Sequence, residues 1–332
     1  MQNTENITSI KQRPLVTFII TYYNIGEALL TECINSILAV SLRDSEREII
    51  LVDDGSEDIP QKVITQYGND IIYIRQSNQG LSAARNTGIT SANGTYIQFV
   101  DGDDKLIIKN YDKCLDRIRS DKPDLLLFAF TSIIDKAKEY DIKGPVEGTY
   151  YMSHNNLRAA ACGYIFRKDI LAGLRFTTGI YHEDENFTPQ LILRCEEILY
   201  TDTEAYYYRQ REDSIINSNN IFKVIKRLND KERVILHLNK LQDTSPKAEQ
   251  NALKRRIAQL TMDYLYDIIT NTASEHYLDR KIARLRRYGL FPLPDNDYTR
   301  KYQLFRIAIK TKLGRTMLIK MCNRNNKRQN NK

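Results

Sequence analysis

Tryptophan is missing from this 332-residue chain, and several features that would assign it to a common class are missing too. No apolar run approaches the roughly 18 residues that cross a bilayer, and no secretory signal opens the chain. The five cysteines are odd in number and form no C-x-x-C pair. This argues against a disulfide framework or a zinc site. We therefore expect a cytoplasmic protein, soluble or peripheral on the inner face of the cell membrane.

Acidic residues are absent from residues 298–332, which carry eleven Lys and Arg residues. Of the 49 basic and 42 acidic residues of the chain, residues 1–297 keep 38 and 42, a net charge of −4. The overall charge of +7 therefore belongs to the C-terminal tail. Because the body of the protein is near neutrality, it offers no footprint for nucleic acid.

Strands and helices are predicted to alternate through the first hundred residues. Runs of β-branched and aromatic residues predict strands at 15–20, 48–52, 71–75 and 96–100, and the intervening segments carry helical periodicity. This alternation indicates parallel strands joined by crossover helices, an open α/β sheet. Beyond about residue 216 the sequence becomes helical and charged. We predict a flexible segment at 1–13, an α/β domain at 14–215, a helical region at 216–297 and a basic tail at 298–332.

Polar clusters follow three of these strands, at 21–24, 53–56 and 101–104. Asp and Gly are common in turns for backbone reasons, so the acidic cluster taken alone is typical of a turn. Three carboxylates within four positions also repel one another, and a hard divalent cation would bind them. Because ligands of open α/β sheets bind beyond the carboxyl ends of the strands, the convergence of three clusters favours a binding site.

Two other α/β classes fit less well. The turn after the first strand, Thr-Tyr-Tyr-Asn-Ile-Gly at 21–26, lacks the glycine pattern of a dinucleotide-binding fold, and the chain has no P-loop lysine motif. A phospho-accepting receiver domain also gathers acids at strand ends. It would need fewer than half of these residues and would leave the second half unexplained.

Four segments together resemble the N-terminal half of family 2 glycosyltransferases, an inverting group with the GT-A fold that includes enzymes of bacterial surface polysaccharides. They are Val-Thr-Phe-Ile-Ile-Thr-Tyr-Tyr-Asn (16–24), Ile-Leu-Val-Asp-Asp-Gly-Ser (50–56), Asn-Gln-Gly-Leu-Ser-Ala-Ala-Arg-Asn-Thr-Gly (78–88) and Phe-Val-Asp-Gly-Asp-Asp (99–104). The resemblance implies a Rossmann-like open mixed sheet flanked by helices, here with a C-terminal helical extension.

The resemblance also implies a nucleotide-diphosphate sugar lying across the strand ends. Thr21, Tyr23 and Asn24 would line the nucleoside pocket, with the Tyr23 ring packing on the base. Asp54 would accept a hydrogen bond from the base, and Arg85 would lie near the diphosphate. From the residues alone, a surface Arg85 paired with a carboxylate is the commoner outcome.

The same resemblance assigns the acidic cluster to metal and donor. Asp103 would hold the ribose or the metal, and Asp104 would ligate Mn²⁺ or Mg²⁺. Asp53 and Asp101 are equally open to a structural role. Downstream, 206–215 resembles the closing strand and loop of the family, where Arg209 or Arg211 would move onto the diphosphate. A solvent-facing charge is an equal alternative for each arginine.

The candidate general base lies in Tyr181–Phe187, which resembles the Glu-Asp motif of the family. On that match Asp184 takes the proton of the acceptor hydroxyl, and Glu183 orients or caps. Acids are also favoured in the first turn of a helix, which is the competing interpretation. The segment 161–167 resembles a region where the family usually carries a Trp. This chain has none, so the acceptor contacts there stay open.

The tail is predicted to contain a basic amphipathic helix at 302–312. Leu304, Phe305, Ala308 and Ile309 share one face of that helix, and this pattern is typical of membrane-surface helices. A solvated terminal helix is the alternative. We expect the tail to meet an anionic membrane surface, and the final residues to be disordered.

Together these features predict a metal-dependent inverting glycosyltransferase. It would move a sugar from a nucleotide-diphosphate sugar, through the resemblance a UDP-sugar, to a hydroxyl of a glycan or lipid-linked acceptor. A nucleotidyltransferase is the alternative among enzymes, although it would usually carry a Gly-rich, Lys- or Arg-bearing loop where residues 21–27 stand. A non-catalytic sugar- or partner-binding module is the third class, and it would have lost Asp104 or Asp184.

Overall fold

A computed structural model describes residues 13–210 and 220–329 of the chain. It divides into two compact units. The first unit comprises the chain up to Val146 together with Ala161–Thr178 and Cys195–Gln210, and the second comprises Glu147–Ala160, Gly179–Arg194 and the described residues from 220 onward. Of the predicted flexible segment 1–13, only residue 13 is described, and Arg211 lies outside the described residues.

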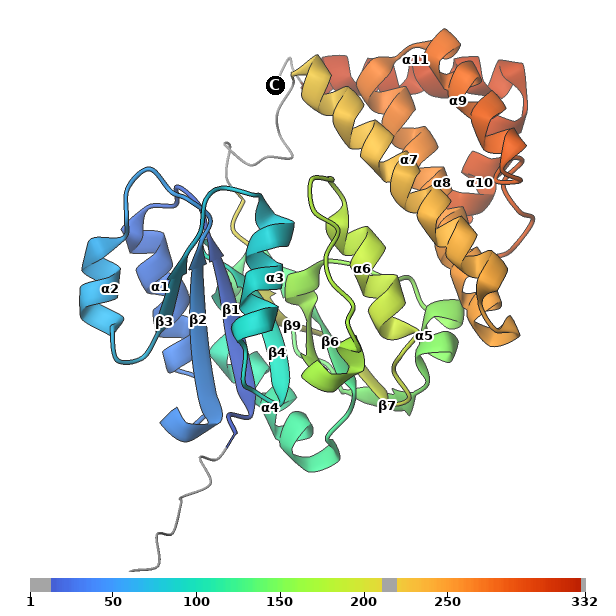
Figure 1. Cartoon of the computed structure of the whole chain (residues 1–332). Coiled ribbons are helices and arrows are strands. Elements are labelled where there is room, and N and C mark those ends of the chain that lie inside the picture. Colours follow the sequence, from blue (N-terminus) through green and yellow to red (C-terminus); the bar gives the residue numbers. More distant parts are fainter. Residues whose placement is uncertain (1–12, 211–219, 330–332) are drawn as a thin grey trace, which may run out of the picture. The chain divides into compact units, whose positions relative to one another are not determined.

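The first unit is built on one sheet of nine strands, in the order β3-β2-β1-β4-β8-β6-β9-β5, with β7 paired to β9 (Figure 1). The strands are β1 (Val16–Tyr22), β2 (Arg47–Asp53), β3 (Ile72–Arg75), β4 (Tyr96–Asp101), β5 (Lys105–Leu106), β6 (Leu125–Thr131), β7 (Lys143–Val146), β8 (Tyr164–Arg167) and β9 (Ile198–Tyr207).

The predicted parallel strands are confirmed in the N-terminal half of this sheet. β1 pairs in parallel with both β2 and β4, and β2 pairs in parallel with β3. All seven residues of β1 are buried, which explains why its sequence is a continuous run of β-formers without polar alternation. Beyond β4 the sheet is mixed, because β8 lies antiparallel between β4 and β6, and β9 runs parallel to β6.

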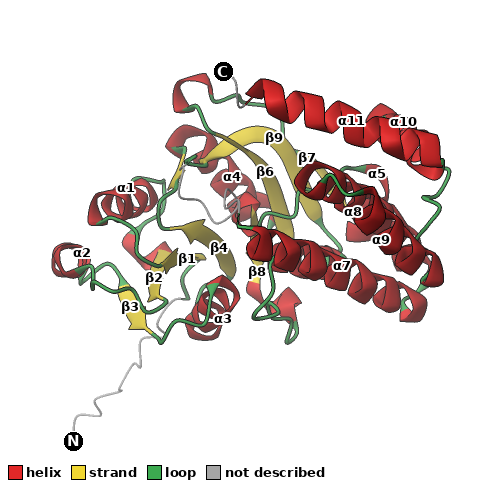
Figure 2. Ribbon diagram, turned by 90° about the horizontal axis from the view of Figure 1, so that it is seen from above, coloured by secondary structure: helices red, strands yellow, loops and turns green. Residues whose placement is uncertain are grey.

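Helices cover both faces of the sheet in the first unit. They are α1 (Glu27–Leu38), α2 (Gln61–Tyr67), α3 (Leu81–Ser91) and α4 (Ile108–Asp121). α1 and α4 lie on one face and α3 on the other (Figure 2). Gly88 allows α3 to approach β1 closely, because a Cβ at this position would lie 2.2 Å from the side chain of Ile19. An alanine at residue 88 would therefore push helix and sheet apart.

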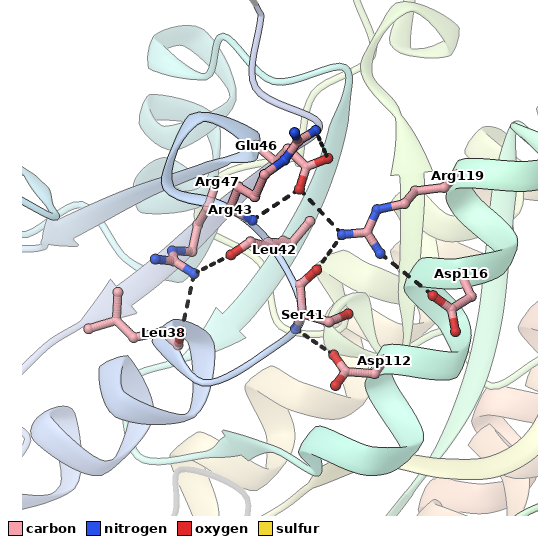
Figure 3. A network of polar contacts seen from close by, with 9 residues as sticks. All are labelled: Leu38, Ser41, Leu42, Arg43, Glu46, Arg47, Asp112, Asp116 and Arg119. Atoms are coloured by element: carbon pink, nitrogen blue, oxygen red, sulfur yellow. Dashed lines mark hydrogen bonds and ion pairs between the residues drawn. The ribbon is translucent and has the colours of Figure 1, made fainter.

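A polar network fixes the connection between α1 and β2 at the amino ends of the strands (Figure 3). Arg119 of α4 donates to the carbonyl oxygen of Ser41 and pairs with Glu46, while the backbone N–H of Ser41 donates to Asp112 over 2.7 Å. The bond from Arg43 lowers the pKa of Glu46 to about 2. The network joins α4 to the sheet at the edge opposite to the predicted site.

The second unit is helical. Its elements are α5 (Gly148–His154), α6 (Glu183–Ile192), α7 (Ile221–Thr244), α8 (Lys247–Thr272), α9 (Glu275–Arg287), α10 (Arg300–Lys310) and α11 (Lys312–Gln329). Glu232 of α7 is buried among them and accepts hydrogen bonds from Tyr264 of α8 and Lys281 of α9, over 3.0 and 2.6 Å. A buried carboxylate with two such partners ties three helices together.

The compact units do not meet at a single boundary near residue 215. Residues 147–160 and 179–194, which the sequence assigns to the α/β domain, belong to the helical unit. The physical reason is that α5 and α6 bury their apolar faces on helices of the C-terminal region, a long-range pairing with no local sequence signal.

The prediction for the tail was wrong for two residues of the face expected to be exposed. Phe305 and Ile309 are buried, and the Phe305 ring contacts Tyr266 of α8 with centroids 6.3 Å apart. Two of the four residues of the predicted membrane face therefore pack inside the second unit, whereas Leu304 of that face is 71% exposed. The segment after residue 322, expected to be disordered, continues as helix α11 to Gln329. Among the described residues, no helix combines the length and the apolarity that crossing a membrane requires.

Candidate active site

Three strand ends converge at the carboxyl edge of the first unit, as the sequence predicts. In the sheet register Tyr22 of β1 lies beside Asp53 of β2, and Thr21 lies beside Asp101 of β4. The polar clusters that follow these strands are therefore neighbours in space. Parallel pairing of β1 with strands on both sides is what places them together.

Asp53 has a structural role, one of the two alternatives left open by the sequence. It is fully buried, and its carboxylate accepts hydrogen bonds from the backbone N–H of Ser56 over 2.8 Å and from the Tyr73 hydroxyl over 2.7 Å. Burial and this carboxylate together raise the pKa of Tyr73 to about 12. Asp53 thereby shapes the turn after β2.

Asp54 holds the loop that leads into α3. Its carboxylate accepts three hydrogen bonds, from the Gln76 amide over 2.7 Å and from the backbone N–H groups of Gln79 and Gly80 over 3.0 and 2.7 Å. Gly80 has a φ of +87°, a conformation in which glycine is favoured. A carboxylate has about four acceptor positions, so Asp54 retains room for one further donor, as its predicted contact with a base requires.

The turn after β1 presents one aromatic ring to solvent. Tyr23, directly after the buried strand, is 49% exposed. Asn24 follows in a left-handed conformation; its backbone N–H donates to the Ser56 hydroxyl over 3.0 Å. Its side-chain oxygen accepts from the N–H of Glu57 over 2.9 Å. Asn24 thus fixes the turn, whereas Tyr23 offers a free ring face.

Arg85 is buried on the inner side of α3. Its guanidinium lies 5.8 and 5.3 Å from the ring centroids of Phe99 and Phe176, and 3.4 Å from the Asp101 carboxylate. The Asp101 carboxylate also lies 3.4 Å from the Thr21 hydroxyl. The structure thus places Arg85 beside the acidic cluster. From the residues alone, a position on the surface was the commoner expectation.

The acidic cluster is organised by β9. Asp104 is 2% exposed, and its carboxylate accepts from the Tyr206 hydroxyl over 2.9 Å and from the backbone N–H of Arg209 over 2.8 Å. The Tyr206 hydroxyl in turn accepts from the backbone N–H of Asp101 over 3.1 Å. One hydroxyl therefore joins the strand end at Asp101 to the carboxylate three residues later.

Burial raises the pKa of Asp104 to about 8, and the charges of Asp101 and Asp103 raise it further. The hydrogen bonds from Arg209 and Tyr206 act in the opposite direction and lower this pKa. This is the electrostatic environment that a divalent cation relieves. Among the residues that the structure describes, no group of three or more His, Cys, Asp and Glu side chains is arranged for a metal. The carboxylates of Asp103 and Asp104 are nevertheless compatible with a divalent cation. Mg²⁺ in phosphate-transfer sites commonly takes only one or two carboxylates, and phosphate oxygens and waters complete its coordination shell.

Arg209 lies next to the cluster, held by a residue that the sequence did not single out. Its Nε–H donates to the carbonyl oxygen of Asp103 over 2.9 Å, and its terminal nitrogen pairs with Glu32 of α1 over 2.7 Å. Lys105 pairs with the same carboxylate over 3.2 Å and thereby lowers the pKa of Glu32. Glu32 is 177 residues from Arg209 in the sequence. No motif around it predicts this contact, because an acidic residue within a helix such as α1 is typical of an ordinary surface position.

The predicted base Asp184 belongs to the second unit, in the first turn of α6. Its side chain accepts from the backbone N–H of Glu185 over 2.8 Å. His182 precedes this helix in a left-handed conformation, and burial together with Lys231 lowers its pKa to about 4.

The sheet, its order and the acidic cluster at its carboxyl edge define a GT-A fold, and similar solved structures share it. A Staphylococcus aureus TarS structure, residues 1–349 in complex with UDP-GlcNAc, matches 94% of this chain and 92% of that one, with a TM-score of 0.55 and 17% identity. The mannosyltransferase PcManGT from Pyrobaculum calidifontis, in complex with GDP-Man and Mn²⁺, matches 94% and 87%, with a TM-score of 0.53 and 12% identity.

Residues 17–174 match the model of glycosyl transferase family 2, and this part of the chain is a family 2 domain. Glycosyltransferase GlyA of Streptococcus pneumoniae is 30% identical over 219 residues, which are 60% of this chain and 31% of GlyA. The uncharacterized glycosyltransferase EpsJ of Bacillus subtilis is 31% identical over 219 residues, 61% of this chain and 63% of EpsJ. The chain thus spans about a third of GlyA and less than two thirds of EpsJ.

The raised pKa of Asp104 predicts a pH-dependent stability of the metal-free protein. The pKa is about 8 in the folded state against 3.8 for an ordinary Asp, so the stability due to its bound proton is complete below about pH 4 and lost as the pH rises through 8. In EDTA, the melting temperature of the wild type should therefore fall relative to Asp104→Asn between pH 5 and 8.5. Asp141→Asn, at an exposed acid, is the control. A difference between wild type and Asp104→Asn that does not change with pH would contradict the assignment.

Proposed function

We propose that this protein is a metal-dependent inverting glycosyltransferase that uses a nucleotide-diphosphate sugar. The observation that carries the proposal is the convergence of Asp54, Arg85 and the cluster Asp101–Asp104 at the carboxyl edge of β1, β2 and β4, within a family 2 domain. TarS was solved with UDP-GlcNAc and PcManGT with GDP-Man and Mn²⁺, and these ligands support a nucleotide-sugar donor here. A UDP-sugar is the donor that we propose.

The donor would bind across the strand ends. The exposed ring of Tyr23 is suited to stack on the base, with Thr21 and Asn24 in the same turn, and Asp54 keeps an acceptor position for it. Asp103 and Asp104 would hold Mn²⁺ or Mg²⁺, which when bound neutralises charge on the diphosphate as it departs. Arg209 would exchange its exposed pairing with Glu32 for the diphosphate, because surface ion pairs contribute only about 0–1 kcal/mol. Arg211 is the alternative for this role.

The transfer would be a single displacement. The acceptor hydroxyl oxygen forms a bond to the anomeric carbon, the bond from this carbon to the phosphate oxygen breaks, and the hydroxyl proton passes to the Asp184 carboxylate. The nucleoside diphosphate leaves with the electron pair of the broken bond. The three acids in the first turn of α6 lie at the positive end of the helix dipole, which favours the ionised form that a base needs.

The acceptor that we propose is a hydroxyl of a glycan or a lipid-linked glycan, in the synthesis of a bacterial surface polysaccharide. A relative supports this proposal: the minor teichoic acid biosynthesis protein GgaB of Bacillus subtilis is 28% identical to this chain over 206 residues. We further propose that the protein works in the cytoplasm, at the inner face of the cell membrane.

Donor binding is tested by thermal melting. UDP with Mn²⁺ at about 100 times the dissociation constant should stabilise the wild type by about 2.7 kcal/mol, a rise of several degrees in melting temperature. Asp104→Asn should abolish the part of the rise that depends on Mn²⁺, because it removes one of two carboxylate ligands. Asp141→Asn should respond like the wild type. If UDP and Mn²⁺ together leave the wild-type melt unmoved, the proposal fails at its first step.

The base is tested separately from donor binding. A panel of UDP-sugars is first screened for metal-dependent hydrolysis, and the best substrate is used for the variants. Asp184→Asn should bind UDP like the wild type while turnover drops by roughly 100- to 10,000-fold, since the amide cannot take a proton. Glu183→Gln should lose less. A larger loss in Glu183→Gln would move the base to Glu183, and near-normal turnover in both variants would place it elsewhere.

For membrane attachment we propose the outward faces of α10 and α11 in place of the face predicted from sequence. Leu304, which belongs to the predicted face, and Ile307 of α10 are 71% and 61% exposed, whereas Phe305 and Ile309 are buried. On α11, Leu313, Met317 and Met321 recur every four residues and are 73%, 56% and 59% exposed. Exposed apolar rows among eleven basic residues and no acidic ones fit an anionic lipid surface.

Sedimentation with lipid vesicles tests this attachment. Removing residues 298–332 would also remove buried side chains, so the double variant Leu313→Asp/Met317→Asp is the sharper probe. The wild type should sediment with phosphatidylglycerol vesicles and much less with phosphatidylcholine vesicles, and the variant should lose binding to both. Phe222→Asp, at an apolar side chain 83% exposed on α7, should bind like the wild type. Equal sedimentation of wild type and double variant would contradict the attachment.

A further inference from the structure

The segment that carries the proposed base is fastened to the C-terminal helices on both of its sides. Its anchors are at residues 181, 185 and 186, which bracket Asp184. These contacts come from α7 and α8, in the part of the chain to which the family model does not extend. The helical extension therefore supports the segment that bears the candidate catalytic group.

The anchor from α8 is a buried ion pair. Arg256 is 5% exposed, and its guanidinium pairs with the Glu185 carboxylate while donating to the carbonyl oxygen of Leu157 over 2.8 Å. A guanidinium this deeply buried is costly without a partner, so the pair fixes both side chains. Arg256 thereby connects the first turn of α6 with the loop before Ala161.

The anchors from α7 hold the chain on either side of Asp184. Asp230, itself 3% exposed, accepts from the backbone N–H of Tyr181 over 3.0 Å. Lys226 bridges the Asp230 carboxylate and the carbonyl oxygen of Gly179, over 2.5 and 3.0 Å. Two turns further along α7, the His237 ring nitrogen lies 2.7 Å from the Asn186 side-chain oxygen.

The ion pair also gives one of the three adjacent acids of this turn a different environment from the other two. Glu183, Asp184 and Glu185 would repel one another, and Arg256 neutralises the last of them. Glu185 is thereby committed to structure, and one of the two like charges next to Asp184 along the chain is compensated. An arginine is suited to this task because its planar guanidinium keeps its charge and a fixed geometry.

We propose that Arg256 is a positioning residue for glycosyl transfer, acting through Glu185 on Asp184. The proposal rests on Asp184 as the base. A base displaced by about 1 Å can cost on the order of 100-fold in rate, whereas the donor-binding carboxylates Asp103 and Asp104 belong to the other compact unit. Loss of Arg256 should therefore lower kcat and leave donor binding intact.

The experiment uses the full chain and the UDP-sugar that it hydrolyses best with Mn²⁺. Arg256→Gln should lower kcat by on the order of 10- to 100-fold, with the KM for the UDP-sugar and the Kd for UDP within about twofold of wild type. Arg256→Lys should recover part of the loss by keeping the charge. The matched control is Arg255→Gln: Arg255 is the neighbouring residue and donates to the Ser153 carbonyl and the Asn156 side chain over 3.1 and 3.0 Å, both outside α6.

A double variant separates positioning from folding. Glu185→Gln/Arg256→Gln removes both charges, so it leaves no buried unpaired ion and keeps the fold even if Arg256→Gln alone does not. Its melting temperature should approach that of the wild type while its kcat stays low. A double variant with near-wild-type kcat would overturn the proposal, and so would a loss in Arg255→Gln as large as that in Arg256→Gln.

The turnover of Asp184→Asn distinguishes a failure of the positioning role from a failure of the proposed function. If Asp184→Asn loses turnover while both Arg256 variants keep it, the positioning role is wrong and the proposed function stands. If Asp184→Asn also keeps turnover, the base assignment is wrong and the positioning role falls with it.

Discussion

The electrostatic repulsion among Asp101, Asp103 and Asp104 is the constraint on which the rest of the first unit depends. A buried strand delivers these carboxylates to one point, and Asp104 is 2% exposed there. In the metal-free protein burial, together with the charges of Asp101 and Asp103, raises the pKa of Asp104 to about 8, so the folded site disfavours the ionised form of this carboxyl. The surrounding elements hold the arrangement in place: Tyr206 and Arg209 of the β9 region bond Asp104, and Arg85 faces Asp101.

Two neighbouring aspartates at the end of β2, Asp53 and Asp54, make different contacts although they are the same residue type. Asp53 and Asp54 are adjacent in sequence, and both are buried. Asp53 bonds only within the turn after β2 and the neighbouring strand, whereas Asp54 binds the loop before α3 and retains an acceptor position at the edge of the sheet. The difference arises at the end of β2, because Asp53 is its last residue and Asp54 already belongs to the loop beyond it. The loops at this edge of the sheet are thus shaped by two buried carboxylates.

The helical unit gives the C-terminal third of the chain a structural task that its sequence does not indicate. Its sequence reads as charged helices without a motif, yet Arg256, Asp230 and His237 contact the segment on both sides of Asp184. The same unit buries the tail residues Phe305 and Ile309, which the sequence placed on an external face. Hydrophobic periodicity identified the helix there. It did not identify which neighbour covers its apolar side, because an apolar face can pack on protein or on lipid with the same residues.

The sequence by itself determined the alternating strands and helices, the parallel direction of the first strands and the position of the acidic cluster at a strand end. These features follow from local patterns: buried β-formers, helical periodicity and Gly/Asp punctuation. Tertiary structure alone decided that Asp53 is structural, that Glu32 pairs with Arg209 177 residues away, and that residues 147–160 and 179–194 join the helical unit. Such pairings depend on which surfaces meet after folding, and a contact between distant residues leaves no trace in the pattern around either one. The cluster at 101–104 is thus evident in the sequence, whereas the residues that hold it and those that brace Asp184 emerge only once the chain has folded.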